Sequence, residues 1–325
     1  MVRRFTRLLM CFTSAIFVLG IDLQSEMTFA MPSSYQNGHD LDSNSLDGQL
    51  KRLGSSLGYP AVNARVDRVW HAIPGLGGFL LDIPASRAQT LRAIDHNLHL
   101  VWQVVAPARG LRDLPPQPIY RGPEREKSVC LMFNVSWGEE YLPGLLQVLS
   151  RQHVHATFFL DGAWVKQHPN LARQVATAGH SVGSHGTGHP DFRRLTDGAI
   201  LAQVTQTNRI IENTVGKCPQ LLAPPGGAYD MRCVEIAHRQ GVYTILWTTD
   251  TIDWRRPPAD VIIERATRGI ANGTLILMHP TEGTVEALPR ILDKLQNQGF
   301  VFKTVDQVVQ ERPASPPPVS LSKQP

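Results

Sequence analysis

Short apolar runs alternate with longer amphipathic stretches from Lys127 to Val305. The apolar runs have the composition of buried strands, and the stretches between them have the spacing of helices. This alternation predicts a parallel sheet covered by helices, which is either closed as a barrel or open as a doubly wound sheet. The predicted strands are residues 129–135, 156–161, 180–183, 220–225, 243–250, 274–279 and 300–305.

The preceding stretch has a different pattern, which predicts a small separate α/β domain of βββ or βαβ type. One segment of it, 86–94, has helical spacing, with Ser86 as the expected N-cap. The segment that follows this domain, LPPQPIYRGP, is rich in proline and predicts a stiff linker. The strands predicted in the small domain are residues 66–73, 79–83 and 99–105.

The N-terminal stretch has the features of an export signal. Three arginines precede an apolar run, and small residues near Ala30 offer a cleavage site. The alternative is an uncleaved anchor that tethers the chain to the membrane. The polar residues that follow predict a disordered linker.

Composition narrows the function classes further. The net charge of +4 is modest and the basic residues are scattered, so no nucleic-acid surface is predicted. Of the four cysteines, Cys11 lies in the leader, and the odd number that remains argues against a disulfide framework. Cys130 lies in an apolar run and is predicted to be a small core residue. The resulting segments are a leader or anchor at 1–30, a disordered linker at 31–45, a small α/β domain at 46–113, a Pro-rich linker at 114–126, the large α/β domain at 127–311 and a disordered tail at 312–325.

Polar or titratable side chains stand at the ends of most of the predicted strands in the large domain. Parallel α/β folds place their sites at the carboxyl ends of strands, so these side chains are predicted to meet in one pocket. Each has a structural alternative when taken alone, because an aspartate after a strand is often only a helix N-cap. The residues are Asn134, Asp161, His185, Asp250 with Asp253, and His279.

Two histidines, His185 and His189, lie four residues apart in the sequence SHGTGHPDF. This spacing can bring two imidazoles to one metal ion. The glycines and the proline around them disfavour a regular helix, so the pair is predicted on a loop or a single turn. The alternative is chance, since the chain has 12 histidines.

Five motifs of the large domain occur together in a fixed order: ATFFLDG, SHGTGHPDFRRLT, APPGGAYD, WTTDTIDW and LILMHP. The segment from Lys127 to about Gln310 thereby resembles the NodB-like polysaccharide deacetylases. The resemblance implies a distorted (β/α) barrel and a metal-dependent hydrolase that removes acetyl groups from N-acetylated sugars.

The chain as a whole resembles one subgroup, the YlxY-like homologues of spore-forming Gram-positive bacteria. This likeness implies an exported protein of the cell wall or the outer face of the membrane. It also implies a link to sporulation and a peptidoglycan or cortex glycan as partner. The stretches that carry the likeness are YPAVNARVDRVWHAIPGLGG, LPPQPIYRG and FNVSWGEEYLP.

The first motif departs from the family pattern. The resemblance implies two adjacent aspartates, in the sequence FDD, as base and metal ligand, and the matching residues here are Phe133-Asn134-Val135. Asn134 stands at the base position, where an amide can orient a water but cannot deprotonate it. Val135 cannot ligate a metal. The arginine of the third motif is also missing, with Ala223 in its place.

A divalent metal, expected to be zinc, would therefore rest on His185 and His189, with water completing its coordination. A carboxylate from Glu139, Glu140 or Asp161 could replace the missing aspartate. The two glutamates equally suit the acidic first turn of a helix, which the helix dipole favours.

The other side of the expected site retains the family residues. The resemblance implies that His279 is the general acid and that Asp253 orients it, since a nearby carboxylate stabilises an imidazolium. Trp254 is expected to form a wall that faces the sugar, with a core tryptophan as the alternative. The amides near Gly226 and Gly227 could line an oxyanion hole, or the glycines could simply permit a tight turn.

These residues lead to two functional hypotheses and a third, weaker one. The first is a deacetylase of cell-wall or cortex glycan with a degenerate first motif. The second is a catalytically inactive homologue that binds the glycan. The third is a structural assembly factor that docks through its N-terminal domain.

Overall fold

The computed structural model describes residues 45–95, 97–313 and 317–321. The predicted leader, and all of the predicted N-terminal linker except Ser45, lie outside the described residues. Among the described helices, none has the length and apolar content needed to cross a membrane. None of the described cysteines forms a disulfide, and Cys130 is buried in the core as predicted.

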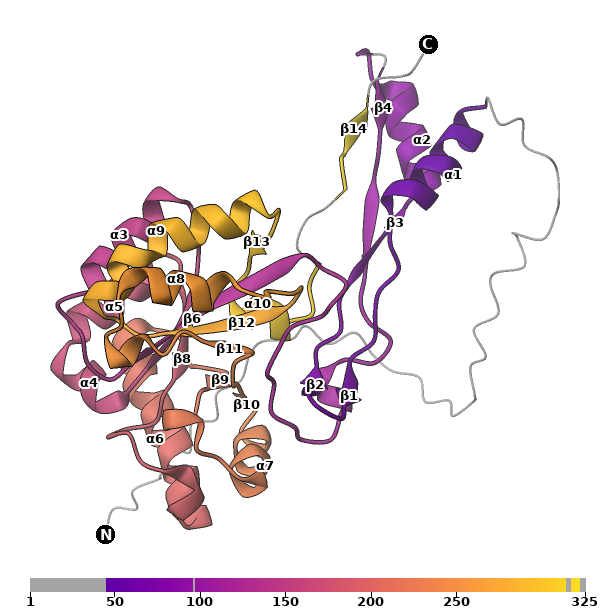
Figure 1. Ribbon diagram of the computed structural model, residues 1–325. Helices are drawn as coiled ribbons and strands as arrows, with labels where there is room; N and C mark the ends of the chain where they lie inside the picture. Colours follow the sequence, from indigo (N-terminus) through magenta and orange to yellow (C-terminus); the bar gives the residue numbers. More distant parts are fainter. Residues whose placement is uncertain (1–44, 96, 314–316, 322–325) are drawn as a thin grey trace, which may run out of the picture. The chain divides into compact units, whose positions relative to one another are not determined.

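A curled sheet of eight strands, all paired in parallel, forms the centre of the large domain (Figure 1). The strand order is β10-β9-β8-β7-β6-β12-β11, with β13 beside the first residues of β6. The two ends of this order, β10 and β11, do not pair with each other, so the barrel is incomplete. The predicted distorted barrel is confirmed. The strands are β6 (Ser128–Val135), β7 (Thr157–Leu160), β8 (Ser181–Ser184), β9 (Leu221–Leu222), β10 (Tyr243–Thr244), β11 (Thr249–Asp250), β12 (Thr274–Met278) and β13 (Val301–Phe302).

The run predicted as one strand at 243–250 is two strands. The chain pairs with β9 at Tyr243 and with β12 at Thr249, so it changes neighbours between these residues. Ile119 fills part of the gap, because it exchanges backbone hydrogen bonds of 2.9 and 2.8 Å with Thr244 and Leu246. The Pro-rich segment at 114–126 is therefore part of the barrel wall and not a free linker.

Strand β6 separates two hydrophobic clusters because alternate side chains of a strand point to opposite faces. One cluster includes Val135 and packs under the helices, while the other contains Cys130 and Met132 and fills the barrel interior. All eight residues of β6 are buried. Burying one large apolar side chain contributes about 2 kcal/mol, so this strand anchors the domain.

Three of the helices, α4, α6 and α9, follow residues whose side chains cap their free N–H groups, namely Asp161, Thr196 and Thr281. Helix α9 packs against α3 and α8, and α6 packs against α4, α5 and α7. The helices are α3 (Leu142–Arg151), α4 (Gly162–Gln167), α5 (Pro169–Thr177), α6 (Asp197–Val215), α7 (Met231–Arg239), α8 (Ala259–Thr267), α9 (Glu282–Asn297) and α10 (Val305–Val309).

The small N-terminal unit contains short antiparallel pairs and two helices. Strands β1 and β2 pair with each other, β3 pairs with β5, and β4 pairs with β14 from the C-terminal tail. The elements are α1 (Leu46–Leu57), β1 (Arg65–Asp67), β2 (His71–Ile73), β3 (Gly78–Leu81), α2 (Ile83–Arg92), β4 (Leu98–His99), β5 (Trp102–Val105) and β14 (Ser320–Leu321).

Three details of this unit differ from the prediction. The strand expected at 66–73 is a hairpin, because the Asp67 carboxylate accepts two backbone N–H groups and turns the chain. Asp82 caps α2, whereas Ser86 lies inside the helix and accepts the N–H of Val101. The tail predicted as disordered supplies β14, since Leu98 and Leu321 pair across the two strands.

Candidate active site

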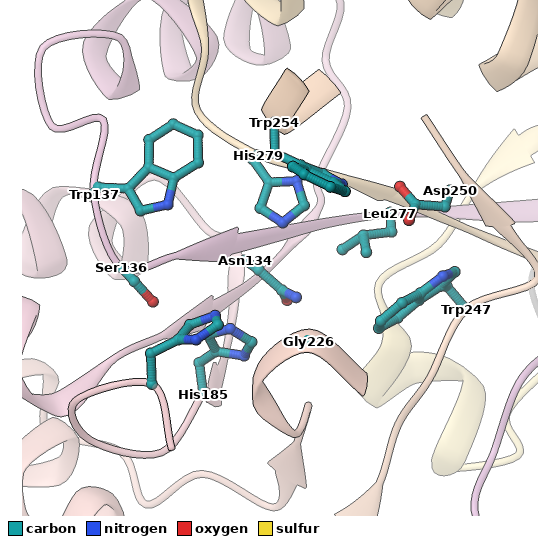
Figure 2. A pocket seen from close by; sticks show the side chains of 11 residues that line it. Asn134, Ser136, Trp137, His185, Gly226, Trp247, Asp250, Trp254, Leu277 and His279 are labelled. Atoms are coloured by element: carbon teal, nitrogen blue, oxygen red, sulfur yellow. The ribbon is translucent and has the colours of Figure 1, made fainter. Parts of the chain in front are cut away.

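One cavity of about 480 Å³ opens at the carboxyl ends of the strands, and it contains most of the predicted site residues (Figure 2). Asp253 lies directly behind His279, with its side chain fully buried. Gly227 is absent from the cavity lining, because it packs beneath the ring of Trp247. The residues that line the cavity are Asn134, Ser136, Trp137, His185, His189, Gly226, Trp247, Asp250, Trp254, Leu277 and His279.

The two motif histidines lie on an irregular loop, as predicted. Gly186, Gly188 and His189 all have positive φ, at 70°, 78° and 54°, which no helix allows. The imidazole centroids of His185 and His189 are 5.4 Å apart. The glycines are therefore what allow the loop to bring both rings to the cavity.

Asp161 holds this loop in place and has no oxygen left for a metal. Its Oδ1 accepts the N–H groups of Ala163 and Trp164 at 2.7 and 3.2 Å and caps α4. Its Oδ2 accepts the N–H groups of Gly188 and His189 at 2.8 and 3.2 Å. The capping alternative describes Asp161 better than the replacement of a lost ligand.

His185 has one free ring nitrogen. Its Nδ1 lies 2.8 Å from the carbonyl oxygen of Ala223, which can only accept, so Nδ1 carries the proton and Nε2 keeps its lone pair. Burial, together with the neighbouring His189, lowers the pKa of His185 to about 3. The ring is therefore a neutral acceptor at pH 7.

Asp253 and His279 form a fully bonded pair. The Asp253 Oδ1 lies 2.8 Å from His279 Nδ1, and its Oδ2 accepts the His279 N–H and the Thr284 hydroxyl at 2.6 Å each. Ile252, just before the pair, has a φ of 53°, which is strained for a β-branched residue. The strained turn directs Asp253 inward, and its carboxylate in turn orients the imidazole toward the cavity.

Three tryptophans surround the cavity, and the sequence reasoning proposed only one of them. Trp254 is 46% exposed, so the alternative of a core tryptophan is wrong, and Arg255 stacks 4.7 Å from its ring centroid. Trp137 is 38% exposed, and its ring lies parallel to that of His279 with centroids 6.0 Å apart. The sequence did not single out Trp247, although it is the first residue of the motif WTTDTIDW, and Trp137 stands two residues after the degenerate motif Phe133-Asn134-Val135.

Asn134 and Val135 are adjacent but face opposite ways. Asn134 lines the cavity, and its Oδ1 is buried with no hydrogen-bond partner among the described residues. Val135 is fully buried in the apolar cluster under the helices, together with Leu160 and Trp164. The strand period therefore turns one of the two motif positions away from the cavity.

Comparisons with known proteins agree with this geometry. The sequence model of the family Polysaccharide deacetylase matches residues 121–245. The uncharacterized protein YlxY of Bacillus subtilis is 39% identical over 250 residues, which cover 77% of this chain and 78% of that protein. The chain belongs to the polysaccharide deacetylase family.

Two further relatives refine the picture of this member of the polysaccharide deacetylase family. The peptidoglycan-N-acetylglucosamine deacetylase PgdA of Listeria monocytogenes is 32% identical over 57% of this chain and 40% of its own length. Wild-type BA3943 of Bacillus anthracis, described as a CE4 family pseudoenzyme, is 37% identical. Its structure has a TM-score of 0.75 and covers 83% of this chain and 97% of that chain. A BA3943 mutant with restored enzymatic activity matches equally well.

Deacetylases of this family generally depend on a metal ion, and the residues here do not fit the expected set of two histidines and an aspartate. Within the described ranges, no group of three His, Cys, Asp or Glu side chains is placed to hold a metal. Val135 faces the core and Asp161 is fully bonded. Glu139 lies 3.9 Å from the His168 ring. Both Glu139 and Glu140 precede α3, so the alternative that they form the acidic first turn of a helix is wrong too.

Proposed function

We propose that this protein is a glycan-binding member of the polysaccharide deacetylase family that does not deacetylate. The single observation that carries the proposal is the place of Val135, which is fully buried in the apolar cluster where the family pattern has a metal ligand. No rotamer of a valine supplies a ligand. With the two histidine nitrogens as its only protein ligands, a metal ion would be held weakly by the protein.

The state of Asn134 supports the same conclusion. A general base must accept a proton from water, and an amide oxygen does so only at strongly acidic pH. The unpartnered Asn134 Oδ1 still offers an acceptor to a ligand. Position 134 therefore supports binding without supporting proton abstraction.

The rest of the cavity supports glycan binding. Ligand sites are typically concave and aromatic, with a few polar groups that converge, and this cavity has three tryptophans with three histidines and an aspartate. The Listeria relative is named for peptidoglycan, which contains N-acetylated sugars. We infer a wall glycan of this hexosamine type as the ligand and an exported location. The role in sporulation stays a prediction.

The test is a pair of measurements on the same preparation of folded protein. Calorimetric titration with hexosamine oligomers, both N-acetylated and free-amine forms, is expected to show binding. Acetate release from the N-acetylated oligomer, with added Zn²⁺ or Co²⁺, is expected to equal that of the buffer. Acetate release above the buffer rate would contradict the loss of activity, and the absence of binding to any oligomer would contradict the glycan-binding role.

A residual deacetylase is the second candidate function. The observation that favours it is the complete Asp253–His279 pair, together with both motif histidines on the same cavity. In this reading His185 and His189 hold a divalent ion and water fills the remaining positions. Metal analysis of purified protein separates the two functions, because a working site retains close to one ion per chain after dialysis and the proposed binder retains almost none.

A further inference from the structure

Three polar groups at the cavity are acceptors. Asn134 Oδ1 is buried without a partner among the described residues, and the His185 Nε2 lone pair is free because Nδ1 is bonded to Ala223. Asp250 adds a carboxylate, of which one oxygen accepts a backbone N–H at 2.8 Å. A ligand that satisfies these three groups must bring several donors, whereas Ser136 Oγ in the same lining can donate or accept.

The charge of the lining points the same way. Asp250 is the only acidic side chain among the residues that line the cavity, and none of those residues is Lys or Arg. Ala223, buried beside the cavity, stands where the family resemblance implies an arginine. Burial raises the pKa of Asp250, and the backbone N–H of Ile252 and the charges of His279 and Arg265 oppose this rise only in part. A bound cation beside the carboxylate would oppose it further.

Aromatic rings flank this carboxylate. Figure 2 shows Asp250 on the same side of the cavity as Trp247 and Trp254, opposite His185, with Asn134 between them. Arg255 already stacks against Trp254, so a cation beside an indole is tolerated here. Indole faces attract cations and also pack against the apolar faces of sugar rings.

A metal ion and an ammonium group are the two cations that fit such a cavity. A metal lacks its third protein ligand here, whereas an ammonium group needs only neutral or anionic acceptors around its three N–H groups. An N-acetyl group in the same place would offer one N–H and would add a carbonyl oxygen close to the Asn134 and Asp250 oxygens. The lining therefore suits the amine better than the amide.

We propose that the cavity recognises the free amine of a de-N-acetylated hexosamine unit in a glycan, with Asp250 as its ion-pair partner and Asn134 as a further acceptor. This proposal rests on the glycan-binding function proposed above. The ligand would be the product of an amide hydrolysis carried out by another enzyme, so the protein would act after a deacetylation step.

The experiment compares a glucosamine oligomer with the N-acetylglucosamine oligomer of the same length, using the full chain in a buffer with chelator. The glucosamine oligomer is expected to bind at least about tenfold more tightly, as a charge-assisted hydrogen bond provides. Asp250→Asn is expected to reduce this preference to about twofold. Asp260→Asn removes an exposed carboxylate outside the cavity and is the matched control, which should leave the preference unchanged.

Each outcome bears on one proposal. Equal or tighter binding of the N-acetylated oligomer overturns the amine proposal and leaves the glycan-binding function standing. Binding of neither oligomer overturns both. If Asp250→Asn does not fold, Asp250→Glu provides the second variant, since it keeps the charge and should keep most of the preference. A preference that is lost with chelator but restored by Zn²⁺ assigns recognition to a metal and contradicts the proposal.

Discussion

His279, which follows β12, and Asp253, which follows β11, keep the hydrogen bonds that orient a general acid, whereas at the end of β6 the neighbouring positions hold an amide and a buried valine. The two sides lie on one cavity and belong to the same family motif set. The departures from the family pattern therefore lie at the positions that would activate a water and at Ala223, which stands in place of the arginine. The Asp253–His279 pair itself is complete.

The difference between the two sides also has a packing explanation. Asp253 stabilises the fold because it is buried and accepts three hydrogen bonds, so replacing it leaves donors unsatisfied. Val135 stabilises the fold as part of the apolar cluster, where an aspartate would be costly without a metal. In a protein that does not catalyse deacetylation, as proposed, apolar packing favours valine at position 135. The three hydrogen bonds still require aspartate at position 253.

The largest expected effect comes from restoring the altered side. The double variant Asn134→Asp, Val135→Asp restores both carboxylates of the family pattern, and it requires the end of β6 to turn residue 135 from the apolar cluster toward the histidines. It should raise acetate release from N-acetylglucosamine oligomers by about 10² to 10⁴-fold over wild type. A BA3943 mutant with restored enzymatic activity is known, so activity can return in a relative described as a pseudoenzyme. Asn134→Asp alone should gain far less. A folded, metal-loaded double variant without activity would show that the defect lies elsewhere.

The next effect comes from breaking the retained side. Asp253→Ala leaves the His279 N–H, its ring Nδ1 and the Thr284 hydroxyl without an acceptor, which should lower the free energy of unfolding by about 3 to 5 kcal/mol. Denaturant unfolding measures this loss. Asp253→Asn keeps the volume and part of the bonding, so it should lose less. If both variants were as stable as wild type, the packing explanation for the conserved pair would be wrong.

The sequence did not predict the two sides of the cavity, at His279 and at Asn134 with Val135, equally well. The alternating pattern and the ordered motifs predicted the barrel, and the strand ends predicted that His185, Asn134 and His279 share a cavity. The sequence could not show that Val135 points to the core, because the direction of the last strand residue depends on register. The sequence also gave no sign that Trp137 belongs to the site, because its stacking on His279 joins loops that are far apart in the chain.

Neutral burial of a histidine is itself no mark of function, and His180 tests this, because it lies at the opposite end of β8 from His185 and outside the cavity. Its Nδ1 accepts the N–H of Ala156 at 3.2 Å, and burial, together with His155, lowers its pKa to about 4. The unfolded chain titrates near 6.5, so stability is complete above that pH and falls as pH drops toward 4. The loss is on the order of 3 kcal/mol.

Replacing His180 with asparagine keeps an acceptor near Ala156 and removes the titration. The free energy of unfolding, measured between about pH 6.5 and pH 4, should then vary less with pH. The reason is that the variant takes up about one proton fewer per chain when it unfolds. The glycan affinity at pH 7 should not change, because His180 lies outside the cavity. An unaltered pH dependence in His180→Asn would show that other groups dominate acid sensitivity.

The smallest expected effect concerns the strained turn before the retained pair. The left-handed backbone of Ile252 costs about 1 to 2 kcal/mol of folding free energy. Glycine would remove that cost, but ordering the more flexible glycine backbone on folding would cost about 1 kcal/mol. Ile252→Gly should therefore change the unfolding free energy by less than about 1 kcal/mol. The informative readout is glycan affinity. If the Asp253 and Thr284 bonds alone fix His279, affinity stays the same, whereas a weaker affinity means that the stiffness of the isoleucine backbone also positions the retained side.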